Sequence, residues 1–388
     1  MKIVIDTRLW GIEHRGLGRY VEQLVTHLAQ FDLSTDFILL TNPHNKTAPQ
    51  NLPPNFKLQP APWRIYSWQE QIYLPRLLNQ LKPDLVFFPH FNVPFFIKQP
   101  YIVTIHDLIL HHYPSSRATT LPKPIYWLKI LAYKIVLKRV INRARTIITI
   151  SEATGNDIKK FYPKVANKIN IIPIAPAEKV APTEIILPEN YFLTVGAAYP
   201  HKNLEMLIRA FQMTRLSRPE IKLIIVGKKD FFMKRLEQEV INNCHSRALS
   251  AVALAKEEGG NPDTKNNTNI IFWGEADETT LATLYTHTSA YLLPSLIEGF
   301  GLGPLEALQY GAPIIVSDIQ VLKEILEDSV TFVNPNNENL WAEAMLQVLN
   351  ENKNLINAAN LLQKYNWTTC AQLTAELLKS LTKTTIHV

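Results

Sequence analysis

The sequence predicts two α/β domains, each built on a parallel sheet with helices on both faces. Short, nearly continuous apolar runs rich in β-branched residues alternate with helix-length segments, which is typical of buried parallel strands. The alternation occurs in two series, separated by a stretch that holds Pro173, Pro176, Pro182 and Pro188. The halves also differ in charge, because residues 1–175 hold 22 Lys and Arg against 10 Asp and Glu, and the remainder holds 18 against 24. Two such series indicate two doubly wound domains with different partners.

The first series predicts a domain over residues 1–175. Amphipathic stretches at Tyr20–Ala29 and Tyr126–Asn142 predict two of its helices. The expected strands are Lys2–Asp6, Phe37–Leu40, Leu85–Phe88, Ile102–Ile105, Thr146–Ile150 and Ile169–Ile174.

The second series predicts a domain over residues 188–365, after a linker at about 176–190. Residues 229–268 form a long polar stretch that we expect to be a helix followed by a mobile surface loop. The expected strands are Phe192–Val195, Leu223–Val226, Asn269–Trp273, Ala290–Pro294, Pro313–Ser317 and Thr331–Val333, and the expected helices are Leu204–Met213, Asp277–Thr286, Leu305–Tyr310 and Asn339–Asn350.

The composition excludes several classes of protein. With 46% hydrophobic and 19% charged residues among 388, the chain is typical of a folded soluble protein. No apolar run reaches the roughly 18–20 residues that span a bilayer, and the first ten residues carry charge too early for a signal peptide. The only two cysteines, Cys244 and Cys370, exclude a disulfide framework and favour a reducing cytoplasm.

The most informative segment is Pro294-Ser-Leu-Ile-Glu-Gly-Phe-Gly-Leu-Gly-Pro-Leu-Glu-Ala-Leu308, which begins where a predicted strand ends. Ligands of open α/β sheets bind beyond the carboxyl ends of strands. Gly299, Gly301 and Gly303 allow a tight turn, and Pro304 suits the first turn of a helix. The free amides of such a helix start form an anion site suited to phosphate.

Two carboxylates flank this turn, Glu298 before the predicted helix and Glu306 in its first turn. A carboxylate accepts hydrogen bonds from two hydroxyls at once, so each could hold a vicinal diol of a sugar or a ribose. The alternative is a glycine turn with a capping acid in the first turn of the helix.

The segment from Glu298 to Ala307 resembles the signature of the retaining glycosyltransferases of family 4. Pro200-His-Lys-Asn203 resembles the mannosyltransferase-like branch, and the matches extend over nearly all of the chain. They are Gly16-Leu-Gly-Arg-Tyr20, Thr104-Ile-His-Asp107, Ile148-Thr-Ile-Ser-Glu152, Val195-Gly196, Lys202-Asn203-Leu204, Ile225-Val226-Gly227, Gly274, Leu284-Tyr285, Gly311-Ala-Pro313 and Tyr365-Asn-Trp367.

This resemblance implies the GT-B fold, in which two Rossmann-like domains face each other across a cleft and a C-terminal helix, here about 366–388, packs back on the first domain. It implies transfer of a hexose from a nucleotide diphosphate sugar, with retention and without a metal or other cofactor. Mannose from GDP-mannose, moved to a polysaccharide or lipid-linked glycan, is the expected reaction. The alternatives are a UDP-sugar-dependent glucosyl- or N-acetylglucosaminyltransferase, an epimerase or phosphorylase of the same fold, and a catalytically degenerate nucleotide-sugar-binding protein.

The resemblance also implies roles for individual residues. Lys202 is expected to neutralise the donor diphosphate, Glu298 to bind the donor sugar and Glu306 to bind the ribose. His106 is expected at the donor sugar, where it shares charge or binds a hydroxyl without acting as a general base. The catalytic set is His106, Glu298 and Lys202; the donor-binding set is Gly18, Gly196, Lys202, Ala276, Glu298, Gly299, Phe300, Gly301, Leu302 and Glu306; the acceptor-side set is Gly16, Arg19 and Asp107.

One departure from the family concerns the cation that usually accompanies the lysine. The family commonly has an arginine either just after the glycine or just before the lysine, and those positions are Ala197 and His201 here. Either one positive partner of the diphosphate is missing, or His201 serves in part.

A basic segment at 117–145 carries eight Lys and Arg and no acidic residue, interleaved with Tyr126, Trp127 and Tyr133. It is compatible with docking on an anionic membrane, on the inner face in the cytoplasm, or with RNA binding. The third alternative is a helix with a solvated basic face and a core-facing stripe of Leu128, Leu131, Ile135 and Val136. We expect a membrane partner rather than a nucleic acid.

Overall fold

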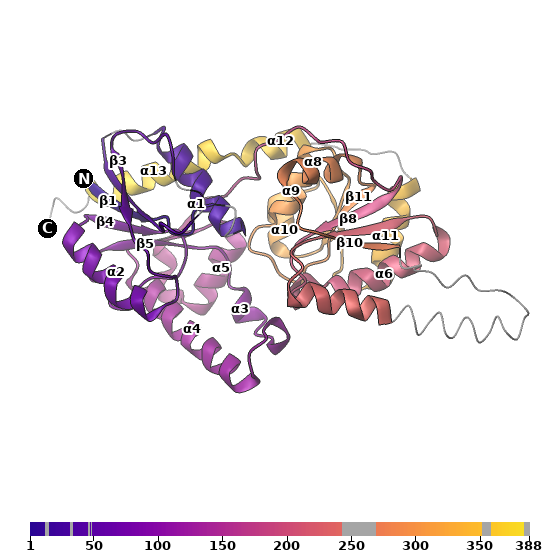
Figure 1. Cartoon of the computed structure of the whole chain (residues 1–388), viewed down its shortest axis with the longest axis horizontal. Helices are drawn as coiled ribbons and strands as arrows, with labels where there is room; N and C mark the ends of the chain where they lie inside the picture. The colour runs from indigo at the N-terminus through magenta and orange to yellow at the C-terminus, as the bar shows by residue number, and fades with distance from the viewer. Residues whose placement is uncertain are drawn as a thin grey trace, which may run out of the picture. The chain divides into compact units, whose positions relative to one another are not determined.

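The computed structural model describes residues 1–11, 15–31, 34–45, 47, 49–242, 269–350 and 358–383. The chain divides into two compact units, each an α/β layer structure (Figure 1). Unit 1 consists of Met1–Pro114, Leu121–Ala175 and Gln363–Val388, and unit 2 of Ser115–Thr120 and Pro176–Leu362.

The expected linker belongs to unit 2, which begins at Pro176 and thus before the predicted residue 188. The backbone N–H of Val180 donates to the Tyr310 hydroxyl over 3.0 Å, and that of Thr183 donates to Thr283 Oγ1 over 2.9 Å. These bonds tie the proline-rich stretch to unit 2.

Unit 1 is built on a seven-stranded, wholly parallel sheet with the order β3-β2-β1-β4-β5-β6-β7. All six strands predicted for this half are present, β1 and β4 with the predicted bounds and the other four with one or both ends shifted, and β3 is added at one edge. Its sequence, Phe-Lys-Leu-Gln-Pro, buries only Phe56, so it lacks the continuous apolar run of the central strands. The strands are β1 Lys2–Asp6, β2 Asp36–Thr41, β3 Phe56–Pro60, β4 Leu85–Phe88, β5 Tyr101–Ile105, β6 Thr146–Thr149 and β7 Ile169–Ile171.

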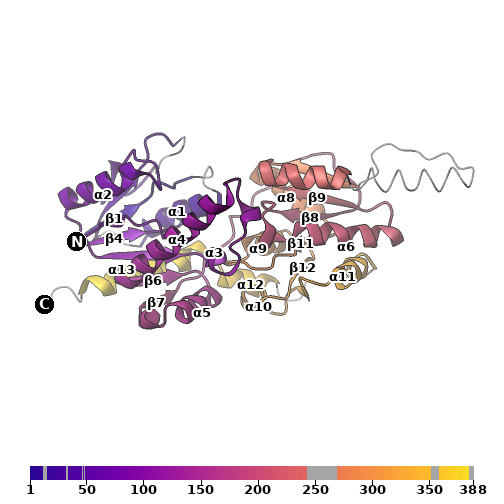
Figure 2. The ribbon, with the colours of Figure 1, turned by 90° about the horizontal axis from the view of Figure 1, so that it is seen from below.

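Helices cover this sheet, and α5 lies against β7 at the edge opposite β3 (Figure 2). The C-terminal helix α13 packs on α1, and its buried residues Trp367, Cys370, Thr374 and Leu378 recur at helical spacing. The helices are α1 Arg15–Leu28, α2 Trp68–Leu81, α3 Ile109–His112, α4 Lys123–Arg143, α5 Glu152–Phe161 and α13 Trp367–Lys383, with a 3-10 turn at Pro163–Lys168.

Helix α4 presents a different face to the core from the one that the sequence indicated. Leu128, Leu131 and Ile135 are 67%, 56% and 53% exposed, so the expected core-facing stripe is wrong for these three. The helix buries Tyr126, Ile130, Leu137, Val140 and Ile141 instead. Apolar residues lie on both sides of this helix, and their spacing alone does not show which side meets the sheet.

Unit 2 is built on a six-stranded, wholly parallel sheet with the order β10-β9-β8-β11-β12-β13, and all six strands predicted for this half are present. The strands are β8 Tyr191–Val195, β9 Lys222–Val226, β10 Ile270–Gly274, β11 Ala290–Leu293, β12 Ile314–Ser317 and β13 Thr331–Val333.

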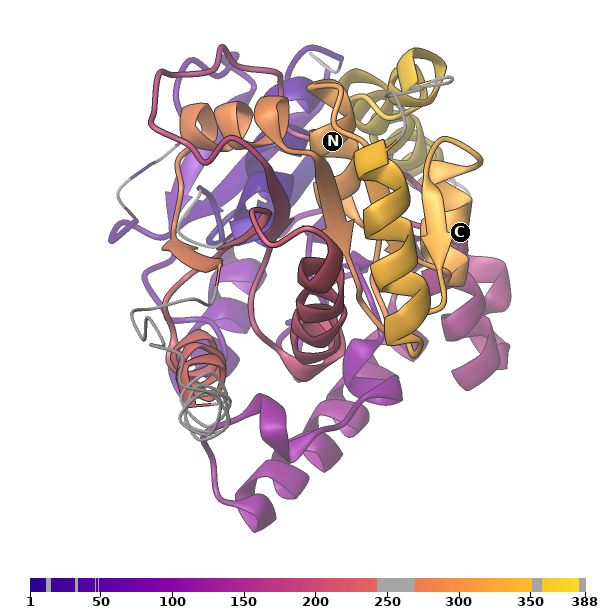
Figure 3. The ribbon, with the colours of Figure 1, turned by 90° about the vertical axis from the view of Figure 1, so that its right-hand side faces the viewer.

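Helices α6 and α11 of unit 2 pack side by side over one face of this sheet (Figure 3). Of the stretch expected at 229–268, residues 231–242 are helical and 243–268 lie outside the described residues. The helices are α6 Leu204–Ser217, α8 Glu278–His287, α9 Leu302–Gln309, α10 Gln320–Leu326 and α11 Glu338–Asn350, with 3-10 turns at Ser116–Ala118 and Pro200–Lys202; α12 Ala358–Lys364 spans the boundary of the units.

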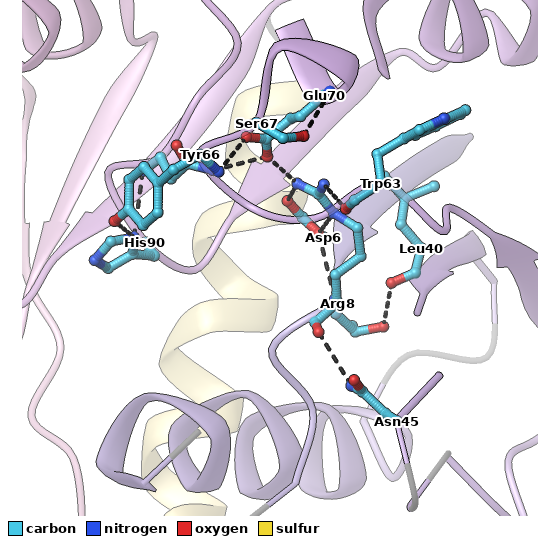
Figure 4. Close-up of polar contacts among 11 residues, drawn as sticks. Asp6, Arg8, Leu40, Asn45, Trp63, Tyr66, Ser67, Glu70 and His90 are labelled. Carbon is cyan, nitrogen blue, oxygen red and sulfur yellow. Dashed lines mark hydrogen bonds and ion pairs between the residues drawn. The ribbon is translucent and has the colours of Figure 1, made fainter. Parts of the chain in front are cut away.

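A buried ion cluster fixes the carboxyl end of β1 in unit 1 (Figure 4). Arg8 is 1% exposed and donates from Nε and Nη2 to the two carboxylate oxygens of Asp6, over 2.7 and 2.6 Å. Its Nη2 also lies 2.6 Å from Glu70 Oε1, in the first turn of α2. Glu70 further accepts from the Asn92 side chain over 2.7 Å and from the Tyr66 backbone over 2.8 Å. The cluster therefore joins β1, α2 and the segment after β4.

We expect the Arg8→Leu variant to lower the free energy of unfolding of unit 1 by about 3–5 kcal/mol, because it leaves two buried carboxylates without their cation. Urea denaturation measures this change. The matched control is Asp157→Asn, which removes a 2.7 Å contact to His112 at the surface of the same unit and should cost less than about 1 kcal/mol. Equal effects of the two substitutions would contradict a stabilising role of the cluster.

Candidate functional site

The predicted donor residues of unit 2 meet at the carboxyl edge of its sheet. Lys202, in the turn after β8, places Nζ 2.6 Å from Oε1 of Glu298, in the loop after β11. The Ser295 hydroxyl donates to the same oxygen over 2.6 Å. The two charged side chains are 24% and 9% exposed. They form a partly buried ion pair, so each compensates the charge of the other.

Backbone contacts hold these two loops together. Asn203 adopts a left-handed conformation, with φ 58°, which asparagine tolerates better than most residues. Its side-chain amide donates to the carbonyls of Pro294 and Pro335 over 3.2 and 2.8 Å. The Leu296 N–H donates to the His201 carbonyl over 2.8 Å. Lys202 is thereby kept beside Glu298.

His201 is neutral at pH 7 in this environment. Burial and, after it, the positive charge of Lys202 lower its pKa to about 4 against the opposing effect of Glu298. The ring stacks on Tyr199 with centroids 5.9 Å apart and 12° between the planes. An arginine at this position would carry a charge that the imidazole does not.

Helix α9 begins at the second glycine cluster. Gly301 precedes it with φ 95°, and a Cβ there would lie 2.5 Å from Leu322 Cδ2. A Cβ on Gly303 would collide with the hydroxyl of the buried Tyr291. Burial, followed by the charges of Glu306 and Glu298, raises the pKa of Tyr291, so its phenol is neutral. Only glycine fits this turn, and the turn brings the first amides of α9 to the sheet edge that carries Glu298.

Glu306 lies in α9 beyond its first turn, so the predicted first-turn position is wrong, because the helix begins at Leu302 rather than at Leu305. Its carboxylate accepts from the Tyr285 hydroxyl of α8 over 3.2 Å. The Tyr285 ring stacks on that of Tyr310, with centroids 5.9 Å apart and 18° between the planes. Of the other predicted donor residues, Phe300 is buried, Ala276 is partly exposed after β10, and a Cβ on Gly196 would meet open space. Gly196, Ala276 and Phe300 thus lie in the loops that follow β8, β10 and β11, whereas Leu302 and Glu306 lie in α9 and Gly18 lies in α1 of unit 1.

In unit 1, His106 directly follows β5. Its Nε2 donates to the Pro89 carbonyl over 2.8 Å, because a carbonyl only accepts. Burial lowers the pKa of His106 to about 4, with an opposing effect of that carbonyl, so the ring is neutral and its Nδ1 is an acceptor. The Tyr20 ring packs against it edge-on at 4.7 Å. Asp107 accepts from the Ile109 N–H over 3.0 Å and thus caps the following helix.

The first glycine cluster has a packing role within unit 1. A Cβ on Gly18 would collide with the Gly11 carbonyl and lie 2.8 Å from that of Leu9, because the loop after β1 crosses α1 here. Gly16 is exposed with no atom near its Cβ position, and Arg19 is partly exposed. The requirement for glycine at 18 thus follows from the fold itself.

Several residues at these sheet edges escaped sequence reasoning. His90 follows β4 as His106 follows β5, and the recurrence of histidine after adjacent strands could have revealed it. Ser295 contacts Glu298, but a hydroxyl at such a position has no distinctive sequence signal. Leu284-Tyr285 is among the matches to the family, but no role was predicted for Tyr285, which contacts Glu306.

Two features are absent from the described part of the chain. It holds no group of three or more His, Cys, Asp or Glu side chains arranged to bind a metal ion. Among the described helices, none combines the length and apolarity that crossing a membrane requires.

Two family models match the chain in succession. Residues 14–175 match the model Glycosyltransferase Family 4, and residues 177–361 match Glycosyl transferases group 1. The chain is 29% identical over 296 residues to the O-antigen chain mannosyltransferase RfbU of Salmonella typhimurium, covering 75% of this chain and 72% of the relative. It is 24% identical over 324 residues to O-antigen chain mannosyltransferase B of Escherichia coli, covering 78% and 76%.

Solved structures agree with the architecture of both units. Sucrose-phosphate synthase of Thermosynechococcus elongatus superposes with a TM-score of 0.69 at 19% identity, covering 98% of this chain and 99% of that one. HepE of Anabaena, in complex with UDP and glucose, gives 0.65 at 16% identity, covering 98% and 100%. With the two successive family matches, these similarities show that the chain is a family 4 glycosyltransferase with the GT-B fold.

Proposed function

We propose that this protein is a retaining glycosyltransferase that moves mannose from GDP-mannose to a polysaccharide or lipid-linked glycan without a metal ion. The observation that carries the proposal is the Lys202–Glu298 pair at the sheet edge that also carries the start of α9. A cation and helix amides suit a diphosphate, and two carboxylates suit sugar and ribose hydroxyls. The two O-antigen chain mannosyltransferases among the relatives support mannose as the sugar.

The ion pair suggests how donor binding is coupled to sugar binding. A diphosphate would compete with Glu298 for Lys202, and the released carboxylate would then accept hydrogen bonds from the donor sugar. Lys202 and the α9 amides would stabilise the charge that develops on the leaving diphosphate, which removes the need for a metal. The bond from the anomeric carbon to the diphosphate oxygen breaks, a bond to the acceptor oxygen forms on the same face, and the acceptor proton passes to the diphosphate.

A donor screen tests this proposal. Purified protein is incubated with GDP-mannose, UDP-glucose and UDP-N-acetylglucosamine, and release of the nucleoside diphosphate is measured with and without a chelator. We expect the highest turnover with GDP-mannose and no effect of the chelator. HepE in complex with UDP-glucose motivates the UDP-sugar alternative, which preferential use of a UDP-sugar would establish. Binding of a nucleotide sugar without turnover would indicate the catalytically degenerate binding protein, and the absence of both binding and turnover would refute the proposal.

We expect Lys202→Ala to lower kcat/KM for the donor on the order of 10²–10³-fold, because it removes charge stabilisation of the leaving group. Glu306→Ala should mainly raise the donor KM, by about 10–100-fold, because the hydrogen bonds from the donor to the charged carboxylate are lost. Steady-state kinetics measure both changes. The control is Lys323→Ala, an exposed lysine of the same unit, which should keep full activity. Full activity of both site variants would refute the assignment.

The neutrality of His201 gives a pH prediction. Because its pKa is lowered to about 4, the ring stays uncharged as pH falls from 8 to 6, and it adds no affinity for the diphosphate over that range. Donor KM against pH should therefore have the same form in wild type and in His201→Gln. His201→Arg should lower the donor KM several-fold. A donor KM that falls toward pH 6 in wild type alone would show that His201 does act as the second cation.

We also propose that α4 docks the protein on an anionic membrane at the cytoplasmic face, where a lipid-linked acceptor would lie. Leu128, Leu131 and Ile135 form an exposed apolar row, and Trp127 is 51% exposed near its start. Exposed Lys129, Lys134 and Lys138 occupy the same helix, and apolar residues flanked by lysines suit the boundary of headgroups and acyl chains. The exposure of this row disfavours the alternative of a merely solvated basic face.

We expect the triple variant Lys129→Gln, Lys134→Gln and Lys138→Gln to bind vesicles with acidic lipid about 100-fold more weakly, at roughly 1 kcal/mol per lysine. Replacing Leu128, Leu131 and Ile135 by serine should weaken binding to neutral and acidic vesicles alike. Co-sedimentation measures both.

A matched control for the membrane experiment is Leu216→Ser, an 87% exposed leucine of α6. It should leave vesicle binding unchanged. Wild-type binding that does not respond to acidic lipid would count against docking through the lysines.

A further inference from the structure

Two histidines follow adjacent strands of the unit 1 sheet. His106 comes directly after β5, and His90 comes two residues after β4, which pairs with β5 in parallel. Their ring centroids lie 6.4 Å apart, with 29° between the planes. Both rings are only partly exposed. The two imidazoles therefore line the same part of the sheet edge.

The hydrogen bonds of His90 determine where its proton lies. The backbone N–H of Asn92 points at Nδ1 over 3.3 Å, and an amide nitrogen can only donate. The Tyr66 hydroxyl lies 3.4 Å from the same nitrogen. Burial and, after it, the neighbouring His106 lower the pKa of His90 to about 3, so the ring is neutral. Nδ1 is thus the acceptor, and the single proton lies on Nε2.

His106 presents the other nitrogen. Its Nε2 proton is taken by the Pro89 carbonyl, which leaves the lone pair of Nδ1 as its remaining hydrogen-bonding group. His90 offers a donor and His106 offers an acceptor at neighbouring positions. A hydroxyl can satisfy both, because it donates and accepts, whereas a phosphate oxygen has no proton to give to Nδ1.

We infer that His90 is a specificity-determining residue, whose Nε2–H donates to a hydroxyl of the transferred sugar while Nδ1 of His106 accepts from that hydroxyl or its neighbour on the ring. This inference rests on the proposed function and on the expectation, from the family resemblance, that His106 lies at the donor sugar. It adds a residue of unit 1 that selects the sugar by its hydroxyl pattern.

The buried ion cluster of unit 1 holds His90 in this orientation. Glu70 binds the side chain of Asn92 and the backbone of Tyr66, and these two residues supply the contacts to Nδ1. In Figure 4 the Nε2 side of the ring points away from the cluster. Because these contacts hold Nδ1 on the side of the ring that faces the cluster, the protonated Nε2 faces away from the cluster. This orientation does not require a charge on the His90 ring.

The position of the proton on each of the two imidazole rings can be tested without measuring activity. Imidazole ¹⁵N–¹H correlation spectra of the full chain, assigned with His90→Gln and His106→Gln, report which nitrogen of each ring is protonated. We expect both rings to be neutral with the proton on Nε2 between pH 6 and 8. A proton on Nδ1 of His90 would overturn the inference, whether or not the protein is active.

The decisive experiment combines His90→Phe with deoxygenated donors. Kinetics are measured with GDP-mannose and its 2-, 3-, 4- and 6-deoxy analogues. In wild type, removal of the contacted hydroxyl should lower kcat/KM about 10–100-fold. His90→Phe should lose a similar factor with GDP-mannose but less than about threefold with that one analogue, because the shared hydrogen bond is already absent. His90→Gln, which retains an N–H donor, should recover part of the loss.

His111→Phe is the matched control, because both nitrogens of His111 are engaged, by Tyr133 at 3.2 Å and Tyr162 at 2.9 Å. Any effect of this variant should be equal for all donors. An equal loss across all donors in His90→Phe as well would indicate a purely structural role and would overturn the inference. Failure of wild type to use any nucleotide sugar would instead refute the proposed function, and the spectra would still decide the tautomer of His90.

Discussion

Both units depend on one constraint, which is that every strand in each sheet runs parallel to its neighbours. The carboxyl ends of all strands in a unit therefore meet at one edge, and chemistry carried by distant parts of the sequence converges there. In unit 1 this edge gathers Arg8, His90 and His106 after β1, β4 and β5. In unit 2 it gathers Lys202 and Glu298 after β8 and β11, which are 96 residues apart in the sequence and 2.6 Å apart in space.

The two edges handle charge in different ways. In unit 1 the guanidinium of Arg8 is enclosed by carboxylates, and His90 and His106 nearby are neutral. The two imidazoles at this edge therefore act as neutral hydrogen-bonding groups rather than as charges. In unit 2 Lys202 and Glu298 compensate each other's charge in a partly buried ion pair. The proposed diphosphate site would depend on this lysine and on the first amides of α9, so the acidic composition of the second half does not argue against it.

The sequence was sufficient for the core strands and for the positions of Lys202 and Glu298 after the ends of two of them, because buried parallel strands are continuous apolar runs and the glycine turn has a specific spacing. It was insufficient for β3, whose edge position needs little apolar content. The neutrality of His201 could not be predicted either, because the pKa depends on burial and on charges brought near by folding. The donor nitrogen of His90 is set by a backbone amide, and no side-chain pattern encodes that contact.

The packing of α13 on α1 has a consequence for the order in which the protein is made. The first 175 residues leave the ribosome early, yet the face of α1 that receives Trp367, Cys370 and Leu378 stays uncovered until the end of the chain emerges. Unit 2, whose residues lie between these two parts, is complete sooner. The half that is synthesised first is thus the half that finishes folding last, and during that interval the exposed apolar side of α1 is a target for chaperones.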